Sequence, residues 1–215
     1  MSNNTLKIKE IFYSLQGEST LVGLPTIFIR LTGCPLRCVY CDTEYAFHGG
    51  ENLAIDAILQ NIKQYPCKTI CVTGGEPLAQ KNCLNLITAL LEQDYQVSIE
   101  TSGAIDVSNV DKRAIKVMDL KTPDSGEEHR NLWSNLEHLT PIDQIKFVIC
   151  SHKDYQWTKE VLQNNPKLAN YECLVSPCFG KVSATELADW VINDGLQVRM
   201  QVQLHKYLWG DQPGK

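Results

Sequence analysis

The sequence lacks the features of an exported or membrane-embedded protein. Its amino-terminal residues include no apolar core of the kind that signal peptides carry, and no apolar run approaches the roughly 20 residues that span a bilayer. Basic residues are also few, because 20 Lys and Arg side chains stand against 25 Asp and Glu side chains and give a formal net charge of -5. We therefore expect a cytoplasmic protein that has no membrane or nucleic-acid partner and acts on a small molecule.

No change in composition along the 215 residues marks a domain boundary, and 43% of them are hydrophobic. A chain of this length and composition can bury one core, so residues 1–215 are predicted to form a single domain. The nine cysteines are odd in number and scattered through apolar segments. This usage fits a reducing compartment better than a disulfide framework, and it leaves thiolates free to bind a metal.

Apolar, β-rich runs alternate with segments of helical periodicity. We expect strands over residues 26–31, 69–72, 96–99, 114–118, 144–150, 171–175 and 197–204, and helices over 53–64, 82–93, 154–164 and 184–193. Alternating strands and helices predict a parallel sheet with helices packed on it. A complete eight-unit barrel needs about 250 residues, so the predicted fold class is α/β, a partial, open β/α barrel of about six parallel strands.

Three cysteines, Cys34, Cys38 and Cys41, form a Cys-x3-Cys-x2-Cys loop directly after the first predicted strand. An iron–sulfur cubane usually takes four thiolates, so a loop that offers three leaves one iron open to another ligand. An open coordination position is typical of a catalytic metal rather than a structural one. The alternative is a structural zinc site in which His48 completes a Cys3His set, and the spacing alone leaves both interpretations open.

Polar or glycine-rich segments follow the next three predicted strands. They are Thr73-Gly74-Gly75-Glu76-Pro77, Glu100-Thr101-Ser102-Gly103 and Asp119-Leu120-Lys121-Thr122-Pro123. Each of them alone is more often an ordinary turn or strand exit. The carboxyl ends of parallel strands lie on one edge, however, so the segments and the cysteine loop together predict one site.

The cysteine loop and the Gly-Gly-Glu-Pro segment after the second strand resemble those of the radical S-adenosylmethionine superfamily. The resemblance implies a 4Fe-4S cluster on Cys34, Cys38 and Cys41, with S-adenosylmethionine on the open iron. It further implies that Tyr40 contacts the adenine, that Gly74, Gly75 and Glu76 receive the amino group, and that Ser102 and Gly103 line the ribose side. It also places Cys41, Asp42, Lys121, Ser176 and Pro177 around S-adenosylmethionine.

Three further segments resemble one family of that superfamily, the 7-carboxy-7-deazaguanine synthases. They are residues 12–18, 28–33 and 203–208. The resemblance implies conversion of 6-carboxy-5,6,7,8-tetrahydropterin to 7-carboxy-7-deazaguanine with release of ammonia, a step toward queuosine and related deazapurines. It also implies that Mg2+ assists, that S-adenosylmethionine is regenerated, that the protein is a homodimer, and that a reductant such as flavodoxin supplies electrons.

The same resemblance assigns the residues that act on the substrate. Leu15, Gln16, Gly17 and Thr101 would hold the pterin, Arg30 would meet its carboxylate and Thr43 would bind Mg2+, while Glu18 and His205 join Arg30 as catalytic residues. The fork of a guanidinium matches a carboxylate, although Arg30 at the end of a strand could also be merely solvated. His205 is expected to project from the last strand, and a lone histidine is otherwise more often structural.

Two other functions remain open from the sequence. A glycyl-radical-activating enzyme would also be a short radical S-adenosylmethionine protein, but it does not account for residues 14–18 or for the segment 205–207. A zinc-binding or electron-carrying module would account for the cysteine loop alone. The remaining cysteines, Cys67, Cys71, Cys83, Cys150, Cys173 and Cys178, form no compact ligand loop, and most are expected to be small buried residues.

Overall fold

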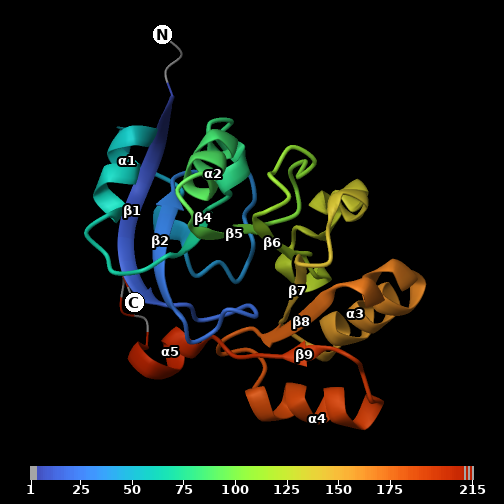
Figure 1. The fold of residues 1–215 in the computed structure, drawn as a ribbon. Helices are drawn as coiled ribbons and strands as arrows, with labels where there is room; N and C mark the ends of the chain where they lie inside the picture. The colour runs from blue at the N-terminus through green and yellow to red at the C-terminus, as the bar shows by residue number, and fades with distance from the viewer. Residues whose placement is uncertain (1–3, 211, 213, 215) are drawn as a thin grey trace.

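A single open sheet runs through the computed structural model, which describes residues 4–210, 212 and 214 (Figure 1). Its parallel strands follow one another in chain order: β2 (Pro25–Leu31), β4 (Thr69–Gly74), β5 (Gln96–Thr101), β6 (Ile115–Asp119), β7 (Gln144–Ile149), β8 (Glu172–Pro177) and the two-residue β9 (Arg199–Met200). The order agrees with the sequential β/α units that the sequence predicts. The predicted α/β class, an open barrel of parallel strands, is confirmed.

Two antiparallel strands extend the sheet at its amino-terminal edge. β1 (Thr5–Leu15) pairs with β2 on one side and with β3 (Glu51–Ala54) on the other. The sequence analysis did not identify either strand. It also began a helix too early, at residue 53, because Leu53 has the apolar character of a helix face but pairs with Leu6 of β1.

Helices follow the strands as expected for β/α units. They are α1 (Ile55–Ile62), α2 (Cys83–Leu91), α3 (His152–Asn164), α4 (Ala184–Asp194) and α5 (Leu204–Trp209). Short 3-10 helices occupy the connections at Glu44–Ala46, Pro77–Ala79, Pro123–Ser125, Glu128–Arg130, Trp133–His138 and Pro166–Asn170. None of the helices in the described residues is both long and apolar enough to cross a membrane.

Alternation along the strands separates the core from the interior of the barrel. In β2, Ile27 and Ile29 are fully buried in the core that α1 and α2 cover, whereas Phe28 and Arg30 point the other way into a cavity. Successive side chains of a strand point to opposite faces, so one short strand serves both purposes. The strands are therefore apolar toward the helices and chemically varied toward the barrel interior.

The carboxy-terminal segment differs from the prediction of a strand over residues 197–204. Only Arg199 and Met200 pair with β8, and the chain then turns into α5, so His205 lies on a helix and not on the last strand. The Leu204 amide donates to the Gly17 carbonyl at 3.0 Å. This contact between distant parts of the chain determines the conformation, and local strand propensity does not reveal it.

Candidate active site

A cavity of about 760 Å³ lies at the carboxyl ends of the parallel strands. This volume is within the usual range for small-molecule sites. Nearly all the residues that the sequence analysis selected line it: Leu15, Gln16, Gly17, Glu18, Arg30, Cys34, Cys38, Tyr40, Cys41, Asp42, Thr43, Gly74, Gly75, Thr101, Ser102, Lys121, Ser176, Pro177 and His205. The exceptions are Glu76 and Gly103, which lie behind the cavity wall. One edge of the sheet thus brings together segments from the whole length of the chain.

The base of the cysteine loop packs closely against the end of β4. The Gly33 amide donates to the Ala46 carbonyl at 2.9 Å, and the Glu76 amide donates to the Gly33 carbonyl at 2.8 Å. A Cβ atom at Gly75 would overlap the Gly33 carbonyl oxygen and the Cys34 Cβ. Glycine at position 75 therefore permits a close backbone approach that any other residue would prevent.

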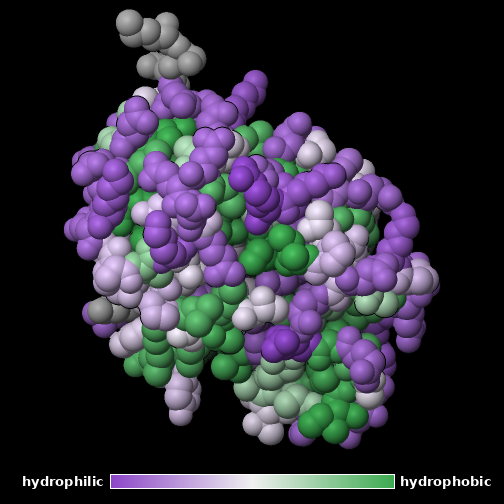
Figure 2. All heavy atoms as spheres, viewed as in Figure 1, coloured by the Kyte–Doolittle hydropathy of each residue, from purple (hydrophilic) through white to green (hydrophobic). Residues whose placement is uncertain are grey.

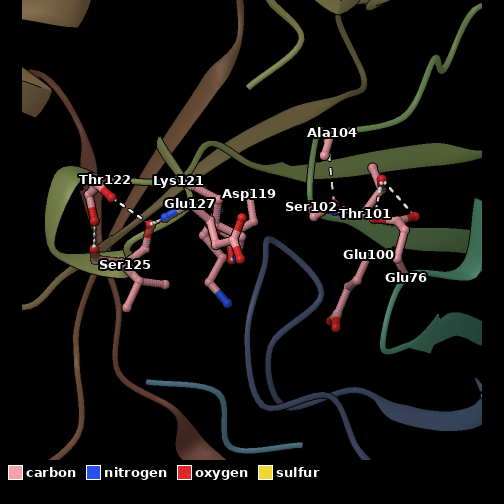
Figure 3. Close-up of polar contacts among 12 residues, drawn as sticks. Glu76, Glu100, Thr101, Ser102, Ala104, Asp119, Lys121, Thr122, Ser125 and Glu127 are labelled. Carbon is pink, nitrogen blue, oxygen red and sulfur yellow. Dashed lines mark hydrogen bonds and ion pairs between the residues drawn. The ribbon is translucent and has the colours of Figure 1, made fainter. Parts of the chain in front are cut away.

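The polar segment 122–131 covers the outer part of the cysteine loop, a role that the sequence analysis did not identify. The Arg37 amide donates to Glu127 Oε1 at 2.5 Å, and the Val39 amide donates to the Ser125 carbonyl at 3.0 Å. Figure 3 shows Ser125 between Thr122 and Glu127, where its hydroxyl donates to the Thr122 carbonyl at 2.6 Å and accepts from the Glu127 amide at 3.0 Å. The segment thus supplies acceptors for the amides on both sides of Cys38 in the cysteine loop.

The three thiols of the loop are free and partly buried. Burial raises the pKa of Cys38 to about 11, and it is also the main cause of the raised pKa values of Cys34 and Cys41. The nearby ammonium of Lys121 opposes this rise at Cys34 and Cys38. Thiol protons must therefore be displaced when a metal binds, as is usual for thiolate ligands.

The arrangement of these thiols fits a cluster better than a single ion. In the part of the chain that the structure describes, no three His, Cys, Asp or Glu side chains converge on a position for one metal ion. His48, the expected fourth ligand of a zinc site, is exposed and does not line the cavity. A cubane binds each cysteine at a different iron, so its ligands need to face one volume without converging on one point.

Lys121 and Tyr40 lie together beside the cysteine loop. Lys121 Nζ lies 2.9 Å from Asp119 Oδ2 and 5.6 Å from the centroid of the Tyr40 ring. Burial by itself lowers the pKa of Lys121, but Asp119 and Cys38 outweigh it and keep the pKa above its usual value. Lys121 is therefore a permanent cation at this wall of the cavity.

Glu76 is completely buried, and four donors already surround its carboxylate. The Leu78 amide, the Thr101 hydroxyl, the Ser102 amide and the Ser102 hydroxyl donate to it at 2.5 to 3.1 Å (Figure 3). With its acceptors occupied in this way, the carboxylate holds Thr101 and Ser102 in place. The contact between Glu76 and an amino group stays a prediction, and the Glu76 side chain lies outside the cavity lining.

Arg30, on β2, is held by one carboxylate and two aromatic rings. Its Nε donates to Glu10 Oε1 at 2.7 Å, and its Cζ lies 5.7 Å from the Phe12 ring centroid and 5.8 Å from that of Tyr45. No hydrogen bond to its terminal nitrogens occurs within the described residues. The guanidinium is thus oriented through Nε, and its two terminal nitrogens remain as donors for a ligand.

Asp42 and Thr43 add oxygen atoms to the cavity next to the last cysteine of the loop. The Thr43 hydroxyl donates to Asp42 Oδ1 at 2.7 Å, and Gln203 Nε2 donates to Asp42 Oδ2 at 3.1 Å. Partial burial opposes ionisation of Asp42, but these hydrogen bonds outweigh it and lower its pKa to about 2. Asp42 is therefore an anion at neutral pH.

Comparison with known proteins agrees with this geometry. Residues 28–122 match the Radical SAM superfamily. The 7-carboxy-7-deazaguanine synthase of Chlorobaculum tepidum is 40% identical over 95% of this chain and 94% of its own length, and that of Koribacter versatilis is 39% identical over 95% and 97%. The chain belongs to the 7-carboxy-7-deazaguanine synthase family. The crystal structure of QueE from Escherichia coli, at 24% identity, superposes with a TM-score of 0.78 over 94% of this chain and 95% of that one and shows the same fold.

Several cavity residues of this family member were not identified from its sequence. They include Phe12, Phe28, Tyr45, Lys146, Val148, Cys178, Phe179 and Gln203. Glu100 and Asp119, which stand in segments that the sequence predicts at the site, also line the cavity. Lys146 could have been identified from the sequence more readily, because a lysine between Ile145 and Phe147 in a buried strand needs a partner for its charge. The prediction that most of the other cysteines pack in the core is confirmed for Cys71, Cys83 and Cys173.

The contact between Glu127 and the cysteine loop predicts a specific effect on cluster retention. Glu127→Ala removes the acceptor of the Arg37 amide, and a hydrogen bond of this kind contributes about 1 kcal/mol. Spontaneous loss of iron from the reconstituted protein should therefore be roughly fivefold faster. Iron released to a chelator over time measures the effect, with Glu137→Ala at an exposed ion pair as the control. Equal rates in both variants would contradict the role of this contact.

Proposed function

We propose that the chain is a radical S-adenosylmethionine lyase that converts 6-carboxy-5,6,7,8-tetrahydropterin to 7-carboxy-7-deazaguanine with release of ammonia, in queuosine and other 7-deazapurine biosynthesis. The observation that carries the proposal is that the three-cysteine loop, Arg30 and the segment 15–18 border one cavity. Similarity over nearly the whole length to 7-carboxy-7-deazaguanine synthases supports it. In this proposal residues 1–215 act as one domain in the cytoplasm.

Cofactor binding is assigned to the wall that contains the cysteine loop. Cys34, Cys38 and Cys41 would hold the 4Fe-4S cluster, and Tyr40, Cys41, Asp42, Gly74, Gly75, Ser102, Lys121, Ser176 and Pro177 would surround S-adenosylmethionine. When bound and reduced, the cluster and S-adenosylmethionine together supply the carbon radical that removes a hydrogen atom from the substrate. Glu76 and Gly103 support this wall from behind, because Glu76 holds Ser102 and the Gly103 carbonyl accepts from the Leu132 amide.

Substrate binding is assigned to other residues that line the same cavity. The terminal nitrogens of Arg30 would bind the substrate carboxylate, since a guanidinium offers two parallel donors. Leu15, Gln16, Gly17 and Thr101 would hold the ring system. His205 lies directly against Gly17, where a Cβ atom would overlap the imidazole Nδ1, so this glycine lets the histidine approach the substrate. Glu18 would accept a hydrogen bond from a ring N–H.

Turnover of 6-carboxytetrahydropterin by the anaerobically reconstituted protein tests the proposed function directly. With S-adenosylmethionine, Mg2+ and reduced flavodoxin or a chemical reductant, we expect 7-carboxy-7-deazaguanine and ammonia in equal amounts, with product exceeding the S-adenosylmethionine supplied. Cys34→Ala, Cys38→Ala and Cys41→Ala should each abolish turnover and the iron–sulfur absorbance. Cys83→Ala and Cys173→Ala, at buried cysteines of the core, should retain iron. Iron loss in both sets would contradict the cluster assignment.

Replacement of Arg30 by lysine tests the carboxylate contact. Arg30→Lys keeps the charge but loses the paired donors, and a hydrogen bond to a charged group contributes about 1.5–3 kcal/mol. We expect kcat/KM for the pterin to fall about 10- to 100-fold while iron content is unchanged. A variant that loses its cluster instead would indicate a structural role for Arg30. Lys7→Arg, at an exposed lysine of β1, provides the control.

A magnesium site at Thr43 is proposed on the chemistry of its donors. Mg2+ prefers oxygen ligands and keeps waters and substrate oxygens beside few protein groups, and the Thr43 hydroxyl and the ionised Asp42 offer such oxygens. Thr43→Val keeps the shape of the side chain but removes its oxygen, so the variant should need about tenfold more Mg2+ for half-maximal rate, a loss of about 1.4 kcal/mol. Thr43→Ser should respond as the parent does. An unchanged response in Thr43→Val would remove this residue from the metal site.

A homodimer is proposed on the distribution of exposed apolar side chains. Ile192 on α4, Tyr207 on α5 and Phe179 expose 74%, 85% and 64% of their surface. Figure 2 shows hydrophobic surface in its lower half, where Figure 1 places α4 and α5, and mostly polar surface over α1 and α2. Large exposed apolar groups are typical of association sites. Light scattering should give the mass of two chains, with Ile192→Asp shifted toward one chain and Lys63→Asp, near α1, unchanged; a parent of one-chain mass would contradict the proposal.

A further inference from the structure

Lys146 is a charged residue in an otherwise apolar strand. Its neighbours Ile145 and Phe147 are fully buried in the core, and alternation turns the lysine toward the cavity. The Lys146 side chain exposes 13% of its surface and that of Glu18 exposes 10%, and Lys146 Nζ forms an ion pair and hydrogen bond with Glu18 Oε2. The pair therefore connects β7 to the segment assigned to the substrate.

The other carboxylate oxygen of Glu18 lacks a hydrogen-bond donor among the residues that the structure describes. Glu18 Oε1 is buried and accepts no hydrogen bond within the described residues. Burial of a carboxylate oxygen without a hydrogen-bond donor costs free energy, and a ligand that donates a hydrogen bond to this oxygen recovers that cost. The backbone of Glu18 is also held, because its amide donates to Gln16 Oε1 at 3.2 Å. The carboxylate thus has one occupied and one unoccupied oxygen at the cavity wall.

β7 holds the loop that carries Glu18 at a second point. The Thr20 amide donates to Gln144 Oε1 at 2.9 Å, and Gln144 Nε2 donates to Thr20 Oγ1 at 2.7 Å. Gln144 and Lys146 are two positions apart and so point to the same face of β7. β7 is separated from β2 in the sheet by β4, β5 and β6, so these contacts cross the barrel interior. Gln144 binds the loop at Thr20, outside the cavity lining. Lys146 binds the Glu18 side chain, which lines the cavity.

The positive charge of Lys146 suits its position beside the Glu18 carboxylate. Burial lowers the pKa of Lys146, but Glu18, Asp119 and Glu100 outweigh it and raise the pKa above its usual value. The ammonium therefore balances the Glu18 carboxylate in a cavity that must also accept an anionic substrate. If it were removed, Glu18 would be a buried charge without compensation.

We propose that Lys146 is a positioning residue that holds Glu18 through Oε2 and thereby directs Oε1 at a ring N–H of a reduced pterin. The inference rests on the proposed function, since it takes the substrate class from there. Lys146 itself need not contact the substrate, because its ammonium is engaged by the carboxylate. Its effect on binding and turnover should then depend on the presence of Glu18.

A double-mutant cycle tests this dependence. Lys146→Met should lower kcat/KM for 6-carboxytetrahydropterin about 10- to 100-fold, the range for one hydrogen bond to a charged group, and Lys146→Arg should retain most of it. In the Glu18→Gln background, the further change from Lys146→Met should stay within about twofold, because the group through which Lys146 acts has already been altered. Lys159→Met, which removes an ion pair with Asp194 outside the cavity, is the matched control and should leave kcat/KM unchanged.

A binding measurement makes the test independent of the loaded cluster. Calorimetric titration of 6-carboxytetrahydropterin into iron-free protein under anaerobic conditions should show the same pattern of losses in dissociation constant, because this ligand keeps the N–H groups of the reduced ring. If Lys146→Met impairs folding, as thermal unfolding would reveal, the cycle is run with Lys146→Gln.

The outcomes separate the two proposals. Parent-like binding and kcat/KM in Lys146→Met would overturn the inference, and an equal loss with and without Glu18 would show that Lys146 acts on the substrate directly. Failure of the parent protein to convert 6-carboxytetrahydropterin would instead overturn the proposed function.

Discussion

The buried carboxylate of Glu76 is the interaction on which the site depends. It accepts from Thr101 and from Ser102 at the end of β5, while the amide of the same residue donates to Gly33 at the start of the cysteine loop. A fully buried charge of this kind is stable only when donors satisfy it, so the strand ends cannot move apart without exposing it unpaired. Gly75 completes the arrangement, because only a residue without Cβ lets β4 pack against this loop.

Cation–carboxylate pairs, in addition to that of Lys206 with Asp42, give the cavity its electrostatic character. Arg30 pairs with Glu10, Lys121 with Asp119 and Lys146 with Glu18, each pair contributed by a different part of the sheet. Mutual pairing keeps each charge stable under partial burial and fixes the direction of each side chain. Within the described residues, Arg30 and Glu18 nevertheless keep atoms without a hydrogen-bond partner, namely the terminal nitrogens of the arginine and Oε1 of the glutamate. The cavity is therefore organised without a ligand and still has donors and acceptors left for one.

Local sequence patterns predicted most of the parallel sheet, and nearly all the site residues selected from these patterns and from the family resemblance line the cavity. The patterns were reliable because parallel strands end on one edge, which makes each polar segment after a strand a candidate for the same site. They failed for β1 and β3, whose half-polar segments do not stand out by periodicity, and for α5, whose conformation depends on the contact of Leu204 with Gly17. The contact of Glu127 with the cysteine loop was also not predicted, since Glu127 lies 90 positions from Arg37, whose amide it binds.

The sequence by itself determined the identity of the metal-binding loop, the fold class and the family, because each is encoded in short segments whose spacing carries the chemistry. Only the tertiary structure decided which carboxylates are saturated and which keep a free oxygen. Glu76 is part of the most recognisable motif, yet its acceptors are occupied, whereas Glu18 keeps Oε1 unpaired. The difference arises from the donors that distant strands bring near each carboxylate. Hydrogen bonds between residues 25 to 128 positions apart in the sequence cannot be predicted from local sequence patterns.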